Sequence, residues 1–446
     1  MLRFHAWRIE HVGIHAFLVA LAAWQRGLEV TFHHEVATKC ERFSRLPVQG
    51  VRGELFSVSD GRHIHFFCRA QGDATTREAS ARAEDKQATK RCLHEHGIEV
   101  PAGRVVDPKA PGQAIDFTHR HPDARFVLKP LAGTLGKGVH RSLTADEVLA
   151  RLPTLSGPHL LEEAIVGREF RLHVVGERVV AAFERLPANV VGNGRDTLAE
   201  LIRRKQALRD DHPVYRHSPL PSIEACSDSL ASQGLVPNGV PADGVRVLLG
   251  EVPSIHEGGD AVDATDWLPE SVCAVGRRIR QAMGLPNTGI DLIVSNLGHP
   301  DERVVVLEAN QNPYITPDAL PLAGVHPGGG NRIADAVIDH YFPASVDAPR
   351  HPQASFDFVA VCQALRGGTL GAITLPHLKA DWVHRRLTVA ATRVDDQTRP
   401  RLQDAIYRLG LNAQLHTTDT GDLLIDLVAP ASRLELFLKA VRGSRA

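Results

Sequence analysis

Two apolar runs in the second half of the chain carry carboxylates at positions where a β-strand would bury them. They are residues 289–293 (GIDLI) and 304–312 (VVVLEANQN), and a short polar loop, SNLGHPDER, joins them. Side chains alternate along a strand, so Glu308 and Asn310 share one face. A hairpin through the loop would bring Asp291 beside Glu308. We therefore expect a mixed α/β (α+β) fold that contains this polar strand pair.

This strand pair has the composition of a metal site. Acidic side chains are rarely buried unless they are paired or bind a metal. Two carboxylates and one amide oxygen suit Mg²⁺, which keeps its other positions for water and nucleotide phosphates. We predict that Asp291, Glu308 and Asn310 are metal ligands. The alternative is that they are ordinary polar groups at strand ends.

A lysine and three glycines follow another apolar strand, in residues 126–139 (FVLKPLAGTLGKGV). Glycines let backbone N–H groups approach phosphate oxygens, and Lys129 at the strand end adds a positive charge. The loop contains neither GxxxxGK[ST] nor a GxGxxG that opens a helix. A glycine-rich turn without a ligand is the alternative, and the downstream carboxylates favour phosphate binding.

Composition excludes several classes of protein. The 446 residues have a formal net charge of -1, so no basic field favours nucleic acid. No apolar run reaches the roughly 18 residues of a membrane-spanning helix. Residues 14–24 resemble a secretory signal, but we expect a helix that opens the first domain. The six cysteines form no C-x-x-C pair, which indicates reduced thiols and a cytoplasmic protein.

The order of the expected elements divides the chain into three domains. We expect an N-terminal α/β domain over 1–80, a larger domain over 81–345 and a C-terminal α/β domain over 356–446. The last domain shows the pattern β-β-α-β-β-α, for which a ferredoxin-like fold is one arrangement. A single charged helix is expected over 75–96, ending at Gly97.

Several ordered blocks carry a family resemblance over roughly 80–345. They include EDKQATKRCLHEHGIEVPAG, LKPLAGTLGKGV, EEAIVGREFRLHVVGERVV, GGDAVDATD, GIDLI and LEANQNPYI. In these blocks the chain resembles the ATP-grasp ligases, and it is most similar to the ATP-grasp modules of cyanophycin synthetase and of bifunctional glutathione synthetase. The further enzymatic halves of those proteins have no counterpart here.

The resemblance implies a nucleotide site with ATP and two magnesium ions, the latter on the three ligands named above. The residues expected to bind ATP are Lys86 (with Lys90 as the alternative), Lys129, Gly133, Gly136, Lys137, Gly138, Glu162, Glu163, Ile165 and Glu169. Lys86 (or Lys90) and Lys129 would hold phosphates, and the glycine loop would cover them. Glu162, Glu163 and Ile165 would line the adenine through backbone groups, and Glu169 would bind the ribose.

The resemblance also implies catalytic and substrate-binding residues. The expected catalytic residues are Arg185, Lys129 and Arg332, and the expected substrate-binding residues are Arg171, His256, Glu257 and Arg332. Surface ion pairing is the alternative for the three arginines. In the loop expected near the acceptor, Gly250 stands where the family pattern has an arginine, so the identity of the substrate stays open.

These roles predict an ATP-dependent carboxylate–amine ligase that acts through an acyl phosphate. Such a reaction needs charge stabilisation and alignment but no protein nucleophile. The expected partners are a small-molecule carboxylate and an amine, without nucleic acid or membrane, and the oligomeric state is open. The alternatives are an ATP-grasp kinase and a nucleotide-binding regulatory protein.

Overall fold

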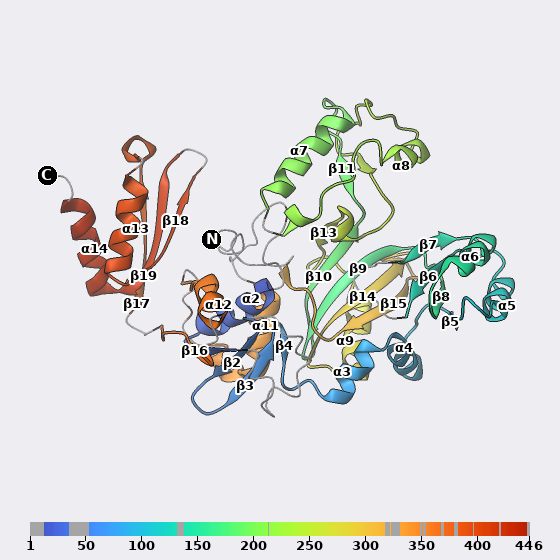
Figure 1. The fold of residues 1–446 in the computed structure, drawn as a ribbon, viewed down its shortest axis with the longest axis horizontal. Helices are drawn as coiled ribbons and strands as arrows, with labels where there is room; N and C mark the ends of the chain where they lie inside the picture. The colour runs from blue at the N-terminus through green and yellow to red at the C-terminus, as the bar shows by residue number, and fades with distance from the viewer. Residues whose placement is uncertain are drawn as a thin grey trace. The chain divides into compact units, whose positions relative to one another are not determined.

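The computed structural model divides the chain into two compact units, which are described separately (Figure 1). The first comprises Met1–Ala74, His212–Val214 and Tyr314–Ala446, and the second comprises Thr75–Asp211 and Tyr215–Pro313. The structure describes residues 13–34, 53–131, 138–212, 214–316, 322, 331–347, 350, 354–366, 370–378, 382–395, 397–418 and 421–443.

The second unit contains the regions with the predicted site. Its helices are α3 (Arg77–Glu84), α4 (Lys86–Glu95), α5 (Gly112–Arg120), α6 (Ala145–Arg151), η2 (Leu152–Thr154), α7 (Leu198–Asp210), η3 (Tyr215–His217), α8 (Ser227–Ser232), η4 (Ile255–Glu257) and α9 (Glu270–Met283). Its strands are β5 (Gly103–Val106), β6 (Phe126–Pro130), β7 (His140–Leu143), β8 (His159–Glu163), β9 (Arg168–Val175), β10 (Arg178–Leu186), β11 (Asn189–Val191), β12 (Arg246–Leu248), β13 (Asp260–Asp263), β14 (Asn287–Ser295) and β15 (Arg303–Asn310).

A five-stranded antiparallel sheet, in the order β13-β10-β9-β14-β15, forms the centre of this unit. Alternate residues of its strands, such as Phe170, Leu172, Ile290 and Leu292, belong to one apolar core that also includes Ile279 of α9. Strand alternation therefore leaves the other face of the sheet for polar side chains.

A second antiparallel sheet, in the order β5-β8-β6-β7, has its own core with α5 and α6. Between β10 and β13 the chain forms a further lobe of β11, α7, α8 and β12, which has a separate apolar cluster. Thr197 caps α7 reciprocally with Glu200, the capping-box arrangement that stabilises a helix start.

One predicted helix is in fact two. The charged segment 75–96 breaks at Asp85, which ends α3 and caps α4 by accepting from the backbone N–H groups of Gln87 and Ala88. An aspartate in extended conformation can satisfy the unpaired donors of a helix start, and this local preference outweighed the continuous helical periodicity.

The first unit contains two further sheets, β16-β1-β2-β3-β4 and β17-β19-β18. Its helices are α2 (Gly13–Trp24), α11 (Arg332–Tyr341), η5 (Pro343–Ser345), α12 (Phe358–Arg366), η6 (Ala391–Arg393), α13 (Thr398–Arg408) and α14 (Ala431–Gly443). Its strands are β1 (Glu29–His33), β2 (Leu55–Ser59), β3 (Ile64–Cys68), β4 (Gln71–Gly72), β16 (Ala372–Thr374), β17 (Trp382–Val389), β18 (Asn412–Thr417) and β19 (Leu423–Pro430).

The expected helix near residues 14–24 is present as α2, which is buried along its length. The C-terminal pattern β-β-α-β-β-α is also present from β16 onwards, although α12 precedes it. The order β17-β19-β18 with two helices matches part of a ferredoxin-like sheet. However, β16 pairs with β1 and α11 packs against α2. The domain boundaries expected at residues 80, 345 and 356 therefore remain a proposal that each of the three domains folds independently. None of the described helices has the length and apolarity that a bilayer crossing requires.

Candidate active site

One face of the five-stranded sheet carries a row of charged side chains on four neighbouring strands. Arg185 of β10 lies opposite Glu169 of β9. Arg171, two residues along β9, lies opposite Asp291 of β14, which lies opposite Glu308 of β15. Because side chains alternate along a strand, the row faces away from the apolar core. The predicted hairpin is therefore confirmed, and it brings two of the predicted metal ligands together.

Arg171 binds Asp291 through both carboxylate oxygens. Its Nε donates to Oδ1, and its Nη2 donates to Oδ2 at 2.6 Å. Burial would raise the pKa of Asp291, but Arg171 and then Arg185 outweigh this effect and hold the pKa below its usual value. Asp291 is therefore an anion, although it is only 6% exposed.

Glu169 is the second buried carboxylate of the row. It accepts a hydrogen bond from Nη1 of Arg185 at 3.1 Å, and Nη1 of Arg141 lies 3.7 Å from its other oxygen. Burial raises the pKa of Glu169, although Arg185 opposes the shift. Because Arg141 belongs to β7, these ion pairs connect the four-stranded sheet with the charged face of the five-stranded sheet.

Two lysines from different elements converge on Glu162. Nζ of Lys129 lies 2.5 Å from Oε2, and Nζ of Lys90 contacts Oε1 and donates to the Pro101 carbonyl at 3.1 Å. Burial, assisted by Lys129, lowers the pKa of Lys90 to about 7. Burial also lowers the pKa of Lys129 to about 8, against the attraction of Glu308. Both ammonium groups therefore titrate near neutral pH.

The two lysines of α4 differ in their relation to this cluster. Lys90 shares Glu162 with Lys129, whereas Lys86 begins the helix and lowers the pKa of Lys129 through its charge. Lys90 was the alternative to Lys86 for the first phosphate-binding lysine. Its position beside Lys129 makes it the stronger candidate, and the role remains a proposal.

The predicted metal ligands have the oxygen chemistry that Mg²⁺ needs. The described residues contain no group of three His, Cys, Asp or Glu side chains that could hold a metal, so the amide of Asn310 would have to contribute. Glu308 is half-buried and makes no ion pair with any described residue. Glu308 lies opposite the buried Asp291, and Asn310 lies two residues further along the same strand, so their oxygens fit a hard cation.

The loop expected near the acceptor leads into β13, where Asp260 pairs with Leu186 and Ala261 pairs with Arg185. His256 and Glu257 belong to η4 and are solvent-exposed. Partial desolvation and then the charge of Arg185 lower the pKa of His256. A Cβ added at Gly250 would meet no atom within 4 Å, so the departure from the family pattern leaves open space there.

The positions of several other predicted residues relative to this cluster stay predictions. Gly133, Gly136 and Lys137 lie outside the described residues. Gly138 follows them with φ +72, a left-handed conformation that favours glycine. Arg332 begins α11 in the first unit. Glu163 ends β8, Ile165 follows it, and both are half-buried.

Sequence reasoning did not find two features of this region. It assigned Glu162 to the adenine through its backbone, but the side chain holds the two lysines. It also overlooked Arg209, which is buried and binds Asp260. The spacing of Lys205 and Arg209, four residues apart in α7, was the available signal, because such residues share a helix face.

Comparison with known proteins gives the class of the protein: the chain has the ATP-grasp fold and is related to the ATP-grasp ligases. The chain is 32% identical over 271 residues to cyanophycin synthetase from Trichormus variabilis, covering 58% of this chain and 29% of that protein. It is 29% identical over 299 residues to the bifunctional glutathione biosynthesis protein of Clostridium perfringens, covering 64% and 38%. No protein-family model matches the chain.

A solved structure agrees with these relatives. The crystal structure of a bifunctional glutathione synthetase from Pasteurella multocida matches with a TM-score of 0.50 and 27% identity, over 65% of this chain and 40% of that chain. The chain thus spans about a third of the length of the relatives it matches. The expected resemblance and fold class are confirmed.

Proposed function

We propose that this protein is an ATP-dependent carboxylate–amine ligase that forms an amide bond and releases ADP and phosphate. The observation that carries the proposal is the charged row on the five-stranded sheet, from Arg185 through Asp291 to Glu308. The strand that carries Lys129, β6, pairs with β7, and Arg141 of β7 lies 3.7 Å from Glu169 in this row. The homology to ATP-dependent ligases supports the same reaction class.

The proposed reaction has two steps. A substrate carboxylate attacks the γ-phosphorus of ATP, the bond to the β-γ bridging oxygen breaks, and an acyl phosphate and ADP form. An amine then attacks the acyl carbon, loses a proton and expels phosphate, so that an amide remains. Both steps require charge neutralisation and alignment, which lysines and arginines can supply.

Each group of residues has a proposed task. Lys90 and Lys129 would bind the phosphates of ATP, and Arg185 would neutralise the phosphoryl group as it moves. Arg171 keeps Asp291 ionised and fixed in the sheet. Asp291, Glu308 and Asn310 would hold Mg²⁺, which neutralises phosphate charge when bound. We also infer a cytoplasmic location, because the six cysteines are dispersed along the sequence and form no C-x-x-C pair.

The test is ADP release from ATP and Mg²⁺ with a panel of amino acids and small peptides as acids and amines. We expect ADP release that depends on the amine and an amide product identified by mass. The variant Glu308→Gln should lower this ADP release by at least about 10²-fold, whereas Glu302→Gln in the neighbouring loop should leave it unchanged. A phosphorylated product formed without an amine would instead identify a kinase, and ATP binding without turnover would identify a nucleotide-binding protein.

A further inference from the structure

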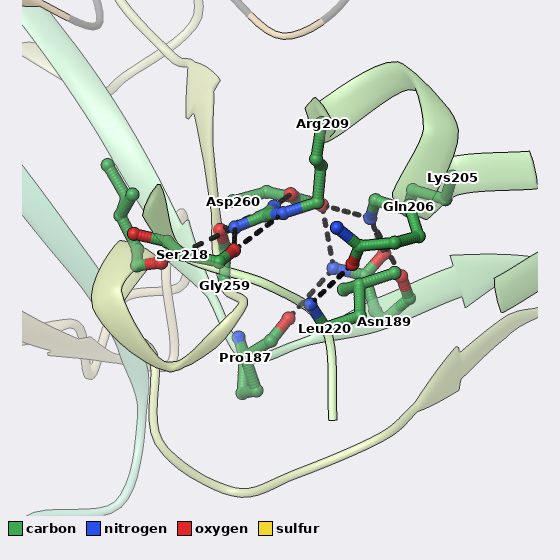
Figure 2. Close-up of polar contacts among 10 residues, drawn as sticks. Pro187, Asn189, Lys205, Gln206, Arg209, Ser218, Leu220, Gly259 and Asp260 are labelled. Atoms are coloured by element: carbon green, nitrogen blue, oxygen red, sulfur yellow. Dashed lines mark hydrogen bonds and ion pairs between the residues drawn. The ribbon is translucent and has the colours of Figure 1, made fainter. Parts of the chain in front are cut away.

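Arg209, near the end of α7, is a fully buried cation whose side chain is enclosed by backbone carbonyls (Figure 2). Its Nε and Nη2 donate to the Ser218 carbonyl at 2.9 and 2.6 Å, and its Nη1 donates to the Gly259 carbonyl at 3.2 Å. The centroid of the Tyr215 ring lies 4.9 Å from the guanidinium carbon of Arg209. Arg209 therefore joins α7 to two segments that follow it in the sequence.

Asp260 completes this buried network at the first residue of β13. One of its oxygens lies 3.1 Å from Nη1 of Arg209, and the other lies 2.5 Å from Nζ of Lys205 and accepts from Asn189 at 2.9 Å. Figure 2 shows that these side chains approach Asp260 from the helix and from β11. In the sheet, Asp260 pairs with Leu186, the residue next to Arg185. The network thus ends one residue from the proposed catalytic arginine.

The segment before Asp260, residues 254–259, forms a tight strap whose last residue, Gly259, lies against Leu186 of β10. Gly259 donates to the Ser254 carbonyl at 2.8 Å, and Gly258 donates to the Ile255 carbonyl at 3.1 Å. A Cβ at Gly259 would lie 2.5 Å from the Leu186 carbonyl oxygen, so only glycine fits there. Gly258 has φ +85, a conformation that also favours glycine. The backbone is thereby fixed against the strand that carries Arg185.

Arg209 also reaches this strap directly. Its Nη2 donates to the Ile255 carbonyl at 3.4 Å, in addition to the contact with Gly259. Ile255 begins η4, which presents His256 to solvent within the electrostatic influence of Arg185. One buried guanidinium therefore contacts the first residue of the short helix that carries His256 and the residue that follows its C-cap.

We propose that Arg209 is a positioning residue for the amine substrate: it holds the strap 254–259 so that His256 and the neighbouring peptide groups border the acceptor position beside Arg185. This inference rests on the proposed ligase function. A buried ion pair is weak evidence for stability, because desolvation offsets its attraction. The lobe also has its own apolar cluster, including Leu198, Leu201 and Leu230, for its stability. The directed contacts of Arg209 instead define the conformation of the strap.

The experiment compares Arg209→Met and Asp260→Asn with the matched control Arg204→Met. Arg204 lies on the same helix and pairs with Asp196 at 2.5 Å, but it is 68% exposed. Kinetics with ATP and the amine should show kcat/KM for the amine lowered by about 10²-fold in the first two variants, the scale expected for a misaligned reactant. The KM for ATP should change by less than about threefold, which corresponds to less free energy than the loss of one charged contact. Arg204→Met should match the wild type in both.

Hydrogen exchange measured by mass spectrometry provides a readout that does not depend on turnover. In both test variants, amides of the strap should exchange faster, while amides of β14 stay as protected as in the wild type. If Arg209→Met fails to fold, Asp260→Asn still removes one partner with little change in shape. Unchanged exchange in the strap would overturn the proposal, as would faster exchange with unchanged amine kinetics. If the wild type itself shows no turnover with any amine, the proposed function fails, and exchange alone decides whether Arg209 holds the strap.

Discussion

The affinity for ATP should fall steeply between pH 6.5 and pH 8.5, because the two lysines that contact Glu162 lose their charges there. A lysine is charged below its pKa, and burial lowers the pKa values of Lys90 and Lys129 to about 7 and about 8. Both charges are therefore present at the acidic end, and they are lost in turn as the pH rises. From these pKa values, the fraction of molecules with both charges falls from about 0.7 to about 0.007, which is about 10²-fold.

Calorimetric titration with ATP and saturating Mg²⁺ would measure this change at constant ionic strength. The range lies above the pKa near 6 at which a terminal phosphate group titrates. We expect Kd to rise by about 10²-fold if both charges are needed for binding. The Lys90→Met variant should bind ATP more weakly than the wild type. Its Kd should rise by only about fourfold over the same pH range, because Lys129 is then the only one of the two lysines that loses its charge.

The exposed Lys109, in the region between β5 and α5, provides a control. Lys109→Met should leave both Kd and its pH dependence unchanged. A Kd for the wild type that is constant over this range would refute the argument that the buried lysines bind phosphate. A dependence in Lys90→Met as steep as in the wild type would show that Lys90 takes no part.

Three further predictions concern catalysis and stability. Glu308→Gln or Lys129→Ala should each lower kcat by at least about 10²-fold, the scale for loss of one charge-stabilising group, and near-normal ADP release by both variants would contradict the site. Asp291→Ala should lower the free energy of unfolding in denaturant by about 3–5 kcal/mol, because it leaves the half-buried guanidinium of Arg171 without its bidentate partner. The double variant Asp291→Ala/Arg171→Met should recover part of this loss. Thr197→Ala should cost about 1 kcal/mol in the same assay by removing the cap of α7, and an unchanged midpoint would exclude that role.

Local patterns predicted much of the secondary structure. The hairpin of β14 and β15 follows from two apolar runs and a polar loop, and the confirmed register places Asp291 opposite Glu308. The hairpin of β9 and β10 likewise joins two largely apolar strands through a turn that contains Gly176, which has a positive φ. The break at Asp85 was not predicted. The sequence around an aspartate that caps a helix resembles the sequence around an aspartate inside a helix, so the pattern did not distinguish the two.

Contacts between distant residues were beyond such patterns. Arg171 and Asp291 are separated by 120 residues, and they meet because β9 and β14 are neighbours in the sheet. Similarly, Lys90 and Glu162 come from a helix and a strand that are 72 residues apart. Many charged residues could form such pairs in a sequence of this length. Only the order of the strands and the packing of the helices select the partners.

The sequence alone determined the periodicity of the strands, the hairpin with its acidic residues and the glycines that permit tight turns, because these depend on steric and hydrogen-bonding preferences within a few residues. The tertiary structure alone decided which lysine lies beside Lys129, which arginine keeps Asp291 ionised and how Arg209 holds the strap. Those choices depend on burial and on charge separation in three dimensions. Both quantities are set by the packing of the whole second unit.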